Sequence, residues 1–345
     1  MLKLTQSKLN QLLLGASLLS TGGGGKLNSA KKLLRKITKT PKLVSLTELK
    51  PQDLVVTLIG VGDKDVCNPI IASLTALKVF QKLFKQKVKA IIPVEIGPLS
   101  TLTAVFLASK LNLPMVDADI VGFRASPEVF LETITLANLS REPIVIANDK
   151  NDILILYRSS SIEVMEQSLR NFATVSGGDA YGVGYPLTAQ QLKNVVGENS
   201  LSYSIKLGND LNQLQNGQIS LSQFCQKNGL IQLAQGKITK AKLQTKNGFI
   251  QGQYFLKTNQ KQTLTVIVKN ENIALLKNDQ PILTVPDSIL LLDIKKFIGI
   301  NNQDKNLGKI IIILGKTAIP IWRSKSGLSL FSPQKLGYNI RQVIL

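Results

Sequence analysis

The chain is organised around the stretch Leu13-Leu14-Gly15-Ala16-Ser17-Leu18-Leu19-Ser20-Thr21-Gly22-Gly23-Gly24-Gly25. Its leucines have helical spacing, and the apolar run stops at four consecutive glycines. Glycine occurs where the backbone needs positive φ or must let a ligand approach closely. We therefore expect a loop whose N–H groups form an anion-binding concavity beside the Thr21 hydroxyl. The alternative is a flexible turn between two helices.

Downstream of this stretch, β-branched apolar runs alternate with segments of helical spacing. Strands are expected at 42–46, 53–61, 90–96 and 114–119, and helices at 30–37, 70–84 and 101–110. This alternation is typical of βαβ units, so we predict an α/β domain with a mostly parallel, helix-covered sheet. Ligands bind beyond the carboxyl ends of the strands in such sheets.

The second half has a different pattern, made of short alternating runs separated by Gly, Asn and Asp turns from about residue 200. Strands are expected at 236–243, 248–256, 263–269, 273–277 and 289–293. This predicts an antiparallel, β-rich and barrel-like domain. We divide the chain into an α/β domain at 1–170 and a β-rich domain at 171–345.

The composition is that of a globular protein, with 345 residues, 44% of them apolar, and a net charge of +20. Basic residues gather at 26–42, but no aromatic residues are interleaved with them, so nucleic-acid binding is not expected. No apolar run reaches 18 residues, which argues against a membrane span. The two cysteines are far apart in sequence and no secretory signal is evident, so we expect a cytoplasmic protein.

The chain contains no histidine. This excludes histidine-based triads, His-zinc sites and imidazole bases, so acid–base chemistry must use carboxylates, Lys, Tyr or Cys. Cys67 is one candidate nucleophile, although its thiolate would need a helix N-terminus or the nearby Lys64.

Glu95 is the most conspicuous acid, because it lies in the apolar segment Pro93-Val94-Glu95-Ile96-Gly97. The alternative is a strand-end acid bonded to loop amides. Asp117 and Asp119 are two residues apart, so on a strand they point the same way and could converge on one ligand or cation. Asp119 could instead stabilise the following turn.

Two further groups are candidates for substrate binding. Arg124 could hold an anionic group or pair with one of the nearby acids. Asn270 and Glu271 form a compact polar cluster with Asn272 at a strand end, for which a solvated turn is the alternative.

Set in order, these pieces resemble the S-methyl-thiohydantoin desulfurase family over nearly the whole chain. The motifs that carry the resemblance are 15–16 leading to 21–25 (Thr-Gly-Gly-Gly-Gly), 93–97 (Pro-Val-Glu-Ile-Gly), 113–119 (Leu-Pro-Met-Val-Asp-Ala-Asp), 127–128 (Pro-Glu), 248–249, 270–272 (Asn-Glu-Asn), 286–287 and 336–338.

The resemblance implies an α/β domain followed by a barrel-like β domain, and hydrolytic loss of methanethiol from a five-membered S-methylated ring. That reaction needs water delivered to a ring carbon and stabilisation of the charged adduct. We expect Glu95, Asp117 or Asp119 to be the base. The glycine loop 21–25, Arg124, Asn270 and Glu271 are expected to bind the substrate.

Two departures from the family pattern flank the expected pocket, at 120–128 and in the loop after Gly62. They leave a divergent, non-catalytic member that binds a small anion or a partner as the alternative. No cofactor is predicted. A divalent metal held by carboxylates stays open, with Mg, Mn or Ca favoured over Zn. Homo-oligomerisation also stays open.

Overall fold

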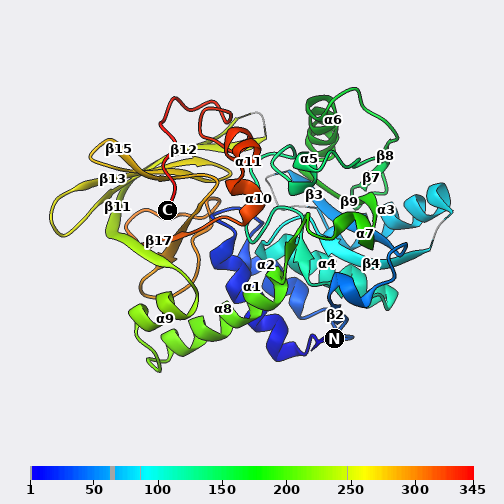
Figure 1. The fold of residues 1–345 in the computed structure, drawn as a ribbon, viewed down its shortest axis with the longest axis horizontal. Coiled ribbons are helices and arrows are strands. Elements are labelled where there is room, and N and C mark those ends of the chain that lie inside the picture. The colour runs from blue at the N-terminus through cyan, green and yellow to red at the C-terminus, as the bar shows by residue number, and fades with distance from the viewer. Residues whose placement is uncertain (1, 63–66, 86, 247) are drawn as a thin grey trace.

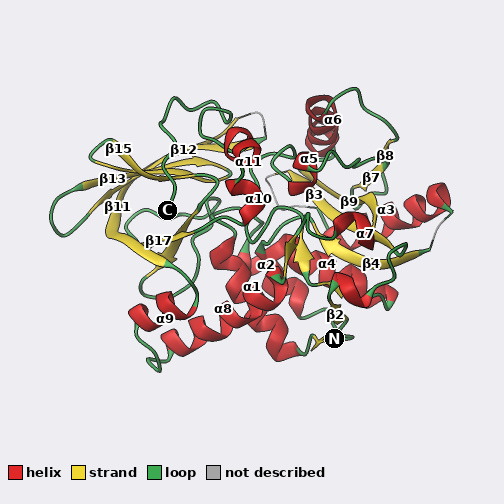
Figure 2. Ribbon diagram, in the orientation of Figure 1, coloured by secondary structure: helices red, strands yellow, loops and turns green. Residues whose placement is uncertain are grey.

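A computed structural model describes residues 2–62, 67–85, 87–246 and 248–345. The ribbon has two lobes, a sheet covered by helices and a curled sheet, with helices α1 and α8 running beneath their junction (Figures 1 and 2). Helix α1 spans Gln6–Leu19 and α8 spans Ser200–Gln215. The glycine loop follows α1 directly.

The first sheet has eight strands within the described residues, in the order β1-β2-β5-β4-β3-β9-β7-β8. Their bounds are β1 Leu2–Lys3, β2 Lys42–Val44, β3 Leu54–Gly62, β4 Val88–Pro93, β5 Met115–Val116, β7 Ile144–Ala147, β8 Ile153–Leu156 and β9 Asp179–Thr188. Strands β2, β5, β4 and β3 pair in parallel, whereas β9 is antiparallel to both β3 and β7. The α/β class is confirmed, and the sheet itself is mixed.

Both faces of this sheet are buried, because a hydrophobic core covers each of them, and β3 directs alternate side chains into the two cores. Leu54, Val56 and Leu58 pack with α1, α3 and α4, whereas Val55 and Ile59 pack with α6 on the other face. The helices of this lobe are α2 Leu27–Leu34, α3 Pro69–Phe84, α4 Pro98–Leu111, α5 Thr133–Leu136, α6 Ile162–Val175 and α7 Ala189–Leu192, with a 3₁₀ turn at Leu46–Glu48.

The second sheet is antiparallel, and its seven strands in the described part of the chain follow the order β15-β14-β13-β12-β11-β17-β16. Their bounds are β11 Ile231–Lys246, β12 Phe249–Lys257, β13 Thr263–Lys269, β14 Glu271–Lys277, β15 Gln280–Thr284, β16 Ser288–Asp293 and β17 Ile310–Lys316. Its two ends approach each other, since β14 and β15 contact β16. The predicted β-rich, barrel-like second domain is therefore confirmed as a curled half-barrel.

Several elements had no counterpart in the predicted pattern. Strand β9 pairs inside the first sheet although it follows residue 170. Its glycines weaken a strand pattern, but a Cβ on Gly182 would lie 2.0 Å from the Val145 carbonyl oxygen, so the close strand approach requires glycine there. Helices α8 and α9 (Leu221–Lys227) occupy the start of the region expected to be β-rich.

The remaining short elements close the junction between the lobes. Strands β6 (Ala118–Asp119) and β10 (Gly197–Glu198) pair as a small ribbon. Helices α10 (Pro320–Arg323) and α11 (Lys325–Leu330) pack through Trp322, whose indole N–H donates to the Val121 carbonyl at 2.7 Å. None of the helices in the described part of the chain is long and apolar enough to cross a bilayer.

The crossing of α1 and α8 generates the first prediction. A Cβ on Gly208 would lie 1.8 Å from the Gln11 carbonyl oxygen, and one on Gly15 would lie 1.9 Å from that of Ser204. Gly208→Ala must push the helices apart, which overpacking data place at about 1–3 kcal/mol of lost stability. We expect thermal unfolding at a lower temperature in this variant. Asn212→Ala on the same helix is the control. Equal melting temperatures of Gly208→Ala and the wild type would contradict the close crossing of α1 and α8 at Gly208.

Candidate active site at the domain interface

A cavity of ≈ 170 Å³ opens where the two lobes meet. Its wall combines the glycine loop, the end of β3, the segment after β4, the loop at 121–132, one side of α6 and the ends of β12 and β14. Segments that are distant in sequence therefore build one site. The site lies beyond the carboxyl ends of β3 and β4, as expected for an α/β sheet.

Glu95 reaches this cavity from the turn between β4 and α4. Its Oε2 accepts the backbone N–H of Ser126 at 3.0 Å. Burial raises the pKa of this carboxyl to about 7, although the Ser126 hydrogen bond works in the opposite direction. Glu95 can therefore exchange a proton near neutral pH.

Asp117 and Asp119 lie outside the cavity wall and point to different partners. Asp117 accepts the backbone N–H groups of Leu201 at 3.1 Å and Ser202 at 2.9 Å, so it holds the start of α8. Asp119 accepts N–H groups from the turn at 121–123, at 3.1, 2.6 and 2.9 Å. The turn-stabilising alternative thus describes the contacts of Asp119. The two carboxylates do not converge on one point.

The glycines at 22–25 form one wall, whereas Thr21 is buried behind it and bonds to the Ser20 carbonyl. The carbonyls of this loop accept hydrogen bonds from neighbouring segments. Leu99 N–H reaches Gly24 at 2.9 Å, and the Asn301 amide reaches Gly25 at 2.9 Å. These contacts fix the loop against α4 and the second lobe. Anion stabilisation by its N–H groups stays a prediction.

Asn270 and Glu271 both line the cavity. Asn270 has φ 56° and accepts the Ile250 N–H at 2.8 Å through Oδ1. Glu271 is only 2% exposed, and its Oε2 is buried without a hydrogen-bond partner. Burial and the charge of Glu95 raise the pKa of Glu271 well above its ordinary value. A solvated turn therefore does not describe this cluster.

Arg124 is buried behind the wall rather than in it. Its Nε donates to the Ala125 carbonyl at 3.1 Å, and its Nη1 donates to that of Pro286 at 2.7 Å. Its guanidinium also stacks on Phe331, 4.6 Å from the ring centre. The side chain therefore connects the loop after β6 to the second lobe.

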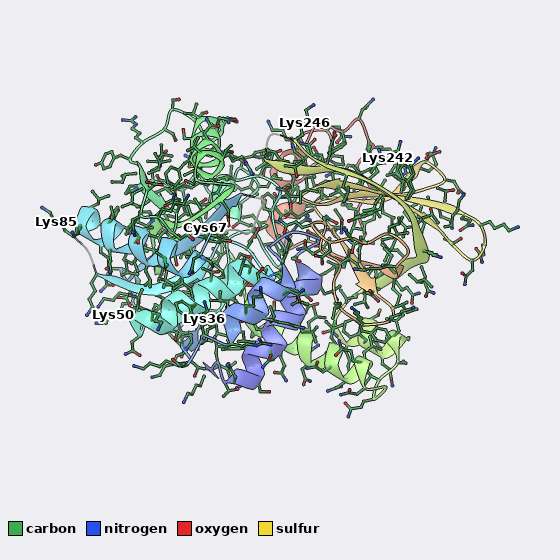
Figure 3. All side chains as sticks on the ribbon, turned by 180° about the vertical axis from the view of Figure 1, so that it is seen from behind. Lys36, Lys50, Cys67, Lys85, Lys242 and Lys246 are labelled. Atoms are coloured by element: carbon green, nitrogen blue, oxygen red, sulfur yellow. The ribbon has the colours of Figure 1, made fainter. Side chains whose placement is uncertain are left out.

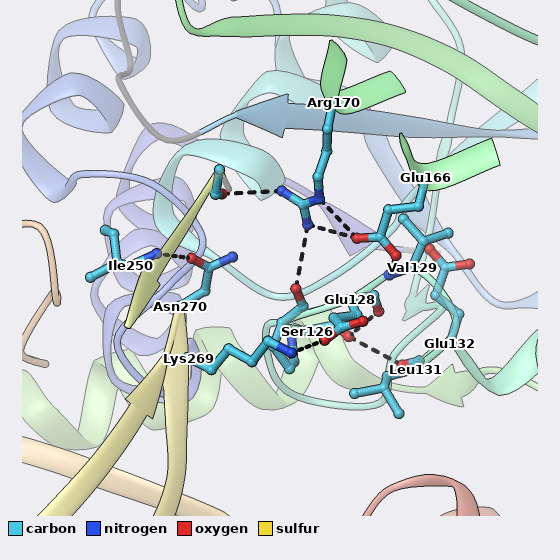
Figure 4. A network of polar contacts seen from close by, with 12 residues as sticks. Ser126, Glu128, Val129, Leu131, Glu132, Glu166, Arg170, Ile250, Lys269 and Asn270 are labelled. Atoms are coloured by element: carbon cyan, nitrogen blue, oxygen red, sulfur yellow. Dashed lines mark hydrogen bonds and ion pairs between the residues drawn. The ribbon is translucent and has the colours of Figure 1, made fainter. Parts of the chain in front are cut away.

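Three acids that line the cavity belong to ion pairs, and two of these pairs are drawn in Figure 4. Arg170 bonds Glu166 at 2.7 Å on α6, Lys269 bonds Glu128, and Arg141 bonds Glu132 at 2.6 Å. These residues were not identified as site residues from the sequence. The i,i+4 spacing of Glu166 and Arg170 could have indicated their ion pair. The position of Glu132 in an apolar segment could likewise have marked it as a buried acid.

Cys67 is buried in the first lobe, whereas the lysines labelled in Figure 3 are exposed. Its backbone N–H donates to the Asp179 carboxylate at 3.0 Å. Burial and the charges of Asp179 and Asp149 raise the pKa of its thiol to about 12. A thiolate nucleophile is therefore disfavoured. Lys64 and most of the atypical loop after Gly62 lie outside the described residues.

No group of three or more acidic or cysteine side chains in the described residues is placed to hold a metal ion. Three of the acids that line the cavity, Glu128, Glu132 and Glu166, instead form ion pairs with basic side chains. We therefore derive no chemistry through a metal.

The raised pKa of Glu95 predicts a pH-dependent stability difference. Its carboxyl titrates at about 7 when folded and near 4.5 when unfolded, so the wild type loses stability as pH rises between these values. Glu95→Gln removes this loss. We expect its free energy of unfolding to gain up to about 3 kcal/mol on the wild type between pH 4 and pH 8, as measured by urea unfolding. Asp279→Asn, at an exposed turn, is the control, and a constant difference across pH would contradict the assignment.

The comparisons with known proteins agree with this architecture. The model of the S-Me-THD-like N-terminal domain matches residues 7–158, and that of the S-Me-THD-like C-terminal domain matches residues 160–344. No curated protein matches the chain. A crystal structure of a protein from Chromobacterium violaceum, a structural genomics target, shares the fold with a TM-score of 0.82 and 22% identity over 99% of both chains. The chain therefore belongs to the S-Me-THD-like family, whose N-terminal and C-terminal domain models match it one after the other.

Proposed function

We propose that this protein hydrolyses a small S-methylated thiohydantoin or hydantoin-like ring, with Glu95 as the general base. Membership of the S-Me-THD-like family supports the substrate class. The cavity of ≈ 170 Å³ has a suitable size, since a cavity of about 150 Å³ holds a benzene-sized ring.

The observation that carries the proposal is the position of Glu95 in this cavity. A general base works best when its pKa lies near the working pH, and that of Glu95 is raised to about 7. Asp117 and Asp119 are less suited to the role, because backbone N–H groups occupy their oxygens away from the cavity. Glu132 is also less suited to the role, because its carboxylate accepts a hydrogen bond from the Tyr185 hydroxyl at 2.9 Å and pairs with Arg141.

The proposed reaction needs one carboxylate. Glu95 takes a proton from water while the water oxygen bonds to the ring carbon that carries sulfur. The electron pair of the ring C=N bond moves to nitrogen, which takes up a proton from solvent as the adduct forms. The C–S bond then breaks as the adduct oxygen forms the carbonyl double bond and its hydroxyl proton passes to solvent. Glu95 returns its proton to the departing methanethiolate. The products are the ring carbonyl compound and methanethiol.

Glu95→Gln provides the direct test of this function. We expect wild-type protein to release methanethiol from an S-methylated thiohydantoin, with kcat/KM rising with pH through about 7 as Glu95 loses its proton. Glu95→Gln should lower kcat by about 100-fold or more, because a general base contributes roughly 10²–10⁴ in rate. A thiol reagent follows the product.

Asp279→Asn is the matched carboxylate-to-amide control, and it should keep wild-type kinetics because Asp279 lies on an exposed turn. Unchanged turnover by folded Glu95→Gln would remove Glu95 from the mechanism. Binding without turnover across a panel of S-methylated thiohydantoins and cyclic ureides would instead favour a non-catalytic binding protein.

A further inference from the structure

Strand β8 forms one edge of the first sheet, because it ends the strand order and pairs with β7 on its inner side. Ile153, Ile155 and Tyr157 along this edge are 40%, 44% and 76% exposed. An edge strand presents unpaired N–H and C=O groups, and proteins commonly protect it with charged residues or Pro. The segment 153–157 contains neither, so this edge is open to pairing with another strand.

The hairpin between β7 and β8 shows which backbone groups face the open edge. Asn148 donates its N–H to the Asp152 carbonyl at 3.1 Å, so that carbonyl points toward β7. The direction alternates along a strand, and residues of even number in β8 therefore also direct their N–H and C=O groups toward β7. Those of Ile153, Ile155 and Tyr157 point outward, and a second strand can pair with them.

The spacing of these three residues allows the edge to pair with an identical copy of itself. In an antiparallel pair with a two-fold axis at Ile155, that residue lies opposite its own copy, and Ile153 lies opposite Tyr157 of the second copy. Outward-facing groups then meet outward-facing groups, so each opposed pair can exchange two hydrogen bonds. A register shifted by one residue would set outward-facing groups against inward-facing ones and lose these bonds.

The side chains are complementary in the same register. Ile153, Ile155 and Tyr157 share one face of β8, so pairing would join them and their copies in one apolar row. Beyond this row, Asp152 would lie opposite Arg158 of the second copy, and both residues are exposed. Asp152 accepts the amide of Asn148 at 2.6 Å, but a carboxylate can accept further hydrogen bonds from a guanidinium.

Local charge does not oppose this contact, although the whole chain carries a net charge of +20. The segment 149–158 contains two acids, Asp149 and Asp152, and two bases, Lys150 and Arg158, so its own net charge is zero. At about 0.15 M salt the Debye length is about 8 Å, so the positive charge elsewhere on the chain is largely screened.

We infer that two copies of this protein associate through β8, antiparallel and around a two-fold axis at Ile155, so that their first sheets become continuous. The partner is a second copy because the backbone groups, the apolar row and the two charged residues all match in this one register. A contact made by a single strand is small, and small interfaces belong to weak complexes. We therefore expect a dimer that dissociates on dilution, with a dissociation constant on the order of micromolar.

Sedimentation velocity at increasing protein concentration, in about 0.15 M salt, measures this equilibrium. Ile155→Lys places like charges opposite each other at the axis, so it should raise the dissociation constant by about 100-fold or more. Leu307→Lys is the matched control, because Leu307 is an apolar residue of the second lobe that is 65% exposed. This control should dimerise like the wild type.

Two charge variants test the register itself. Arg158→Asp sets an acid against Asp152 of the second copy, and Asp152→Arg sets a base against Arg158, so each variant alone should dimerise more weakly than the wild type. An equimolar mixture of the two variants restores opposite charges at both contacts and should form a heterodimer. Hydrogen exchange of the wild-type amides at 153–157 should slow as the protein concentration rises.

A wild-type protein that stays monomeric would overturn the inference, whether its edge is free or takes a strand of another protein. A dimer that Ile155→Lys leaves intact would place the interface elsewhere. Variants that associate no better in the mixture than alone would exclude this register. Melting temperatures establish that each variant folds. If one does not, the wild type decides, because exchange at 153–157 that is independent of concentration contradicts the inference by itself.

Discussion

The site depends on a steric constraint at the glycine loop, whose backbone lies against the backbone of Gly97 and the side chain of Asn302 too closely to admit a Cβ. A Cβ on Gly24 would lie 2.4 Å from the Gly97 Cα, and one on Gly22 would lie 2.2 Å from the Asn302 amide nitrogen. Gly24 also has φ +67°, which favours glycine. The loop can therefore join the turn that carries Glu95 to the strand end that carries Glu271. The cavity exists because these segments are held together.

Two kinds of acid line this cavity: some pair with a basic side chain, and others form no such pair. The three ion pairs place opposite charges in contact, which limits the cost of burying them. Among the described residues, neither Glu95 nor Glu271 forms such an ion pair, although the charges of Arg124 and Arg170 act on Glu271, and burial raises the pKa of each acid. Raised carboxyl pKa values in a cavity are a feature of functional sites. Burial raises the pKa values of Glu132 and Glu166 in the same wall as well, so it is the lack of an ion pair that distinguishes Glu95 and Glu271.

The alternation of apolar runs was sufficient to predict most of the fold. The hairpin strand over Thr263–Lys269 has the predicted bounds, and the segment at 53–61 forms most of the central strand β3. The apolar pattern did not predict elements whose secondary structure depends on the segments packed around them. Strand β9 contains glycines that its close neighbours require, and α8 has a polar sequence whose apolar positions are buried in the core that it shares with α1.

The sequence by itself determined that acid–base chemistry must proceed without histidine, that glycines replace side chains at one loop, and that Glu95 is an acid in an apolar segment. Only the tertiary structure decided which acids share a cavity. Asp117 and Asp119 have the same spacing whether they face a ligand or a backbone, and distant N–H groups engage them. Glu271 lines the same cavity as Glu95 although the two residues lie far apart in the sequence. Burial and partners, which set a carboxylate's role, arise from contacts that no local pattern encodes.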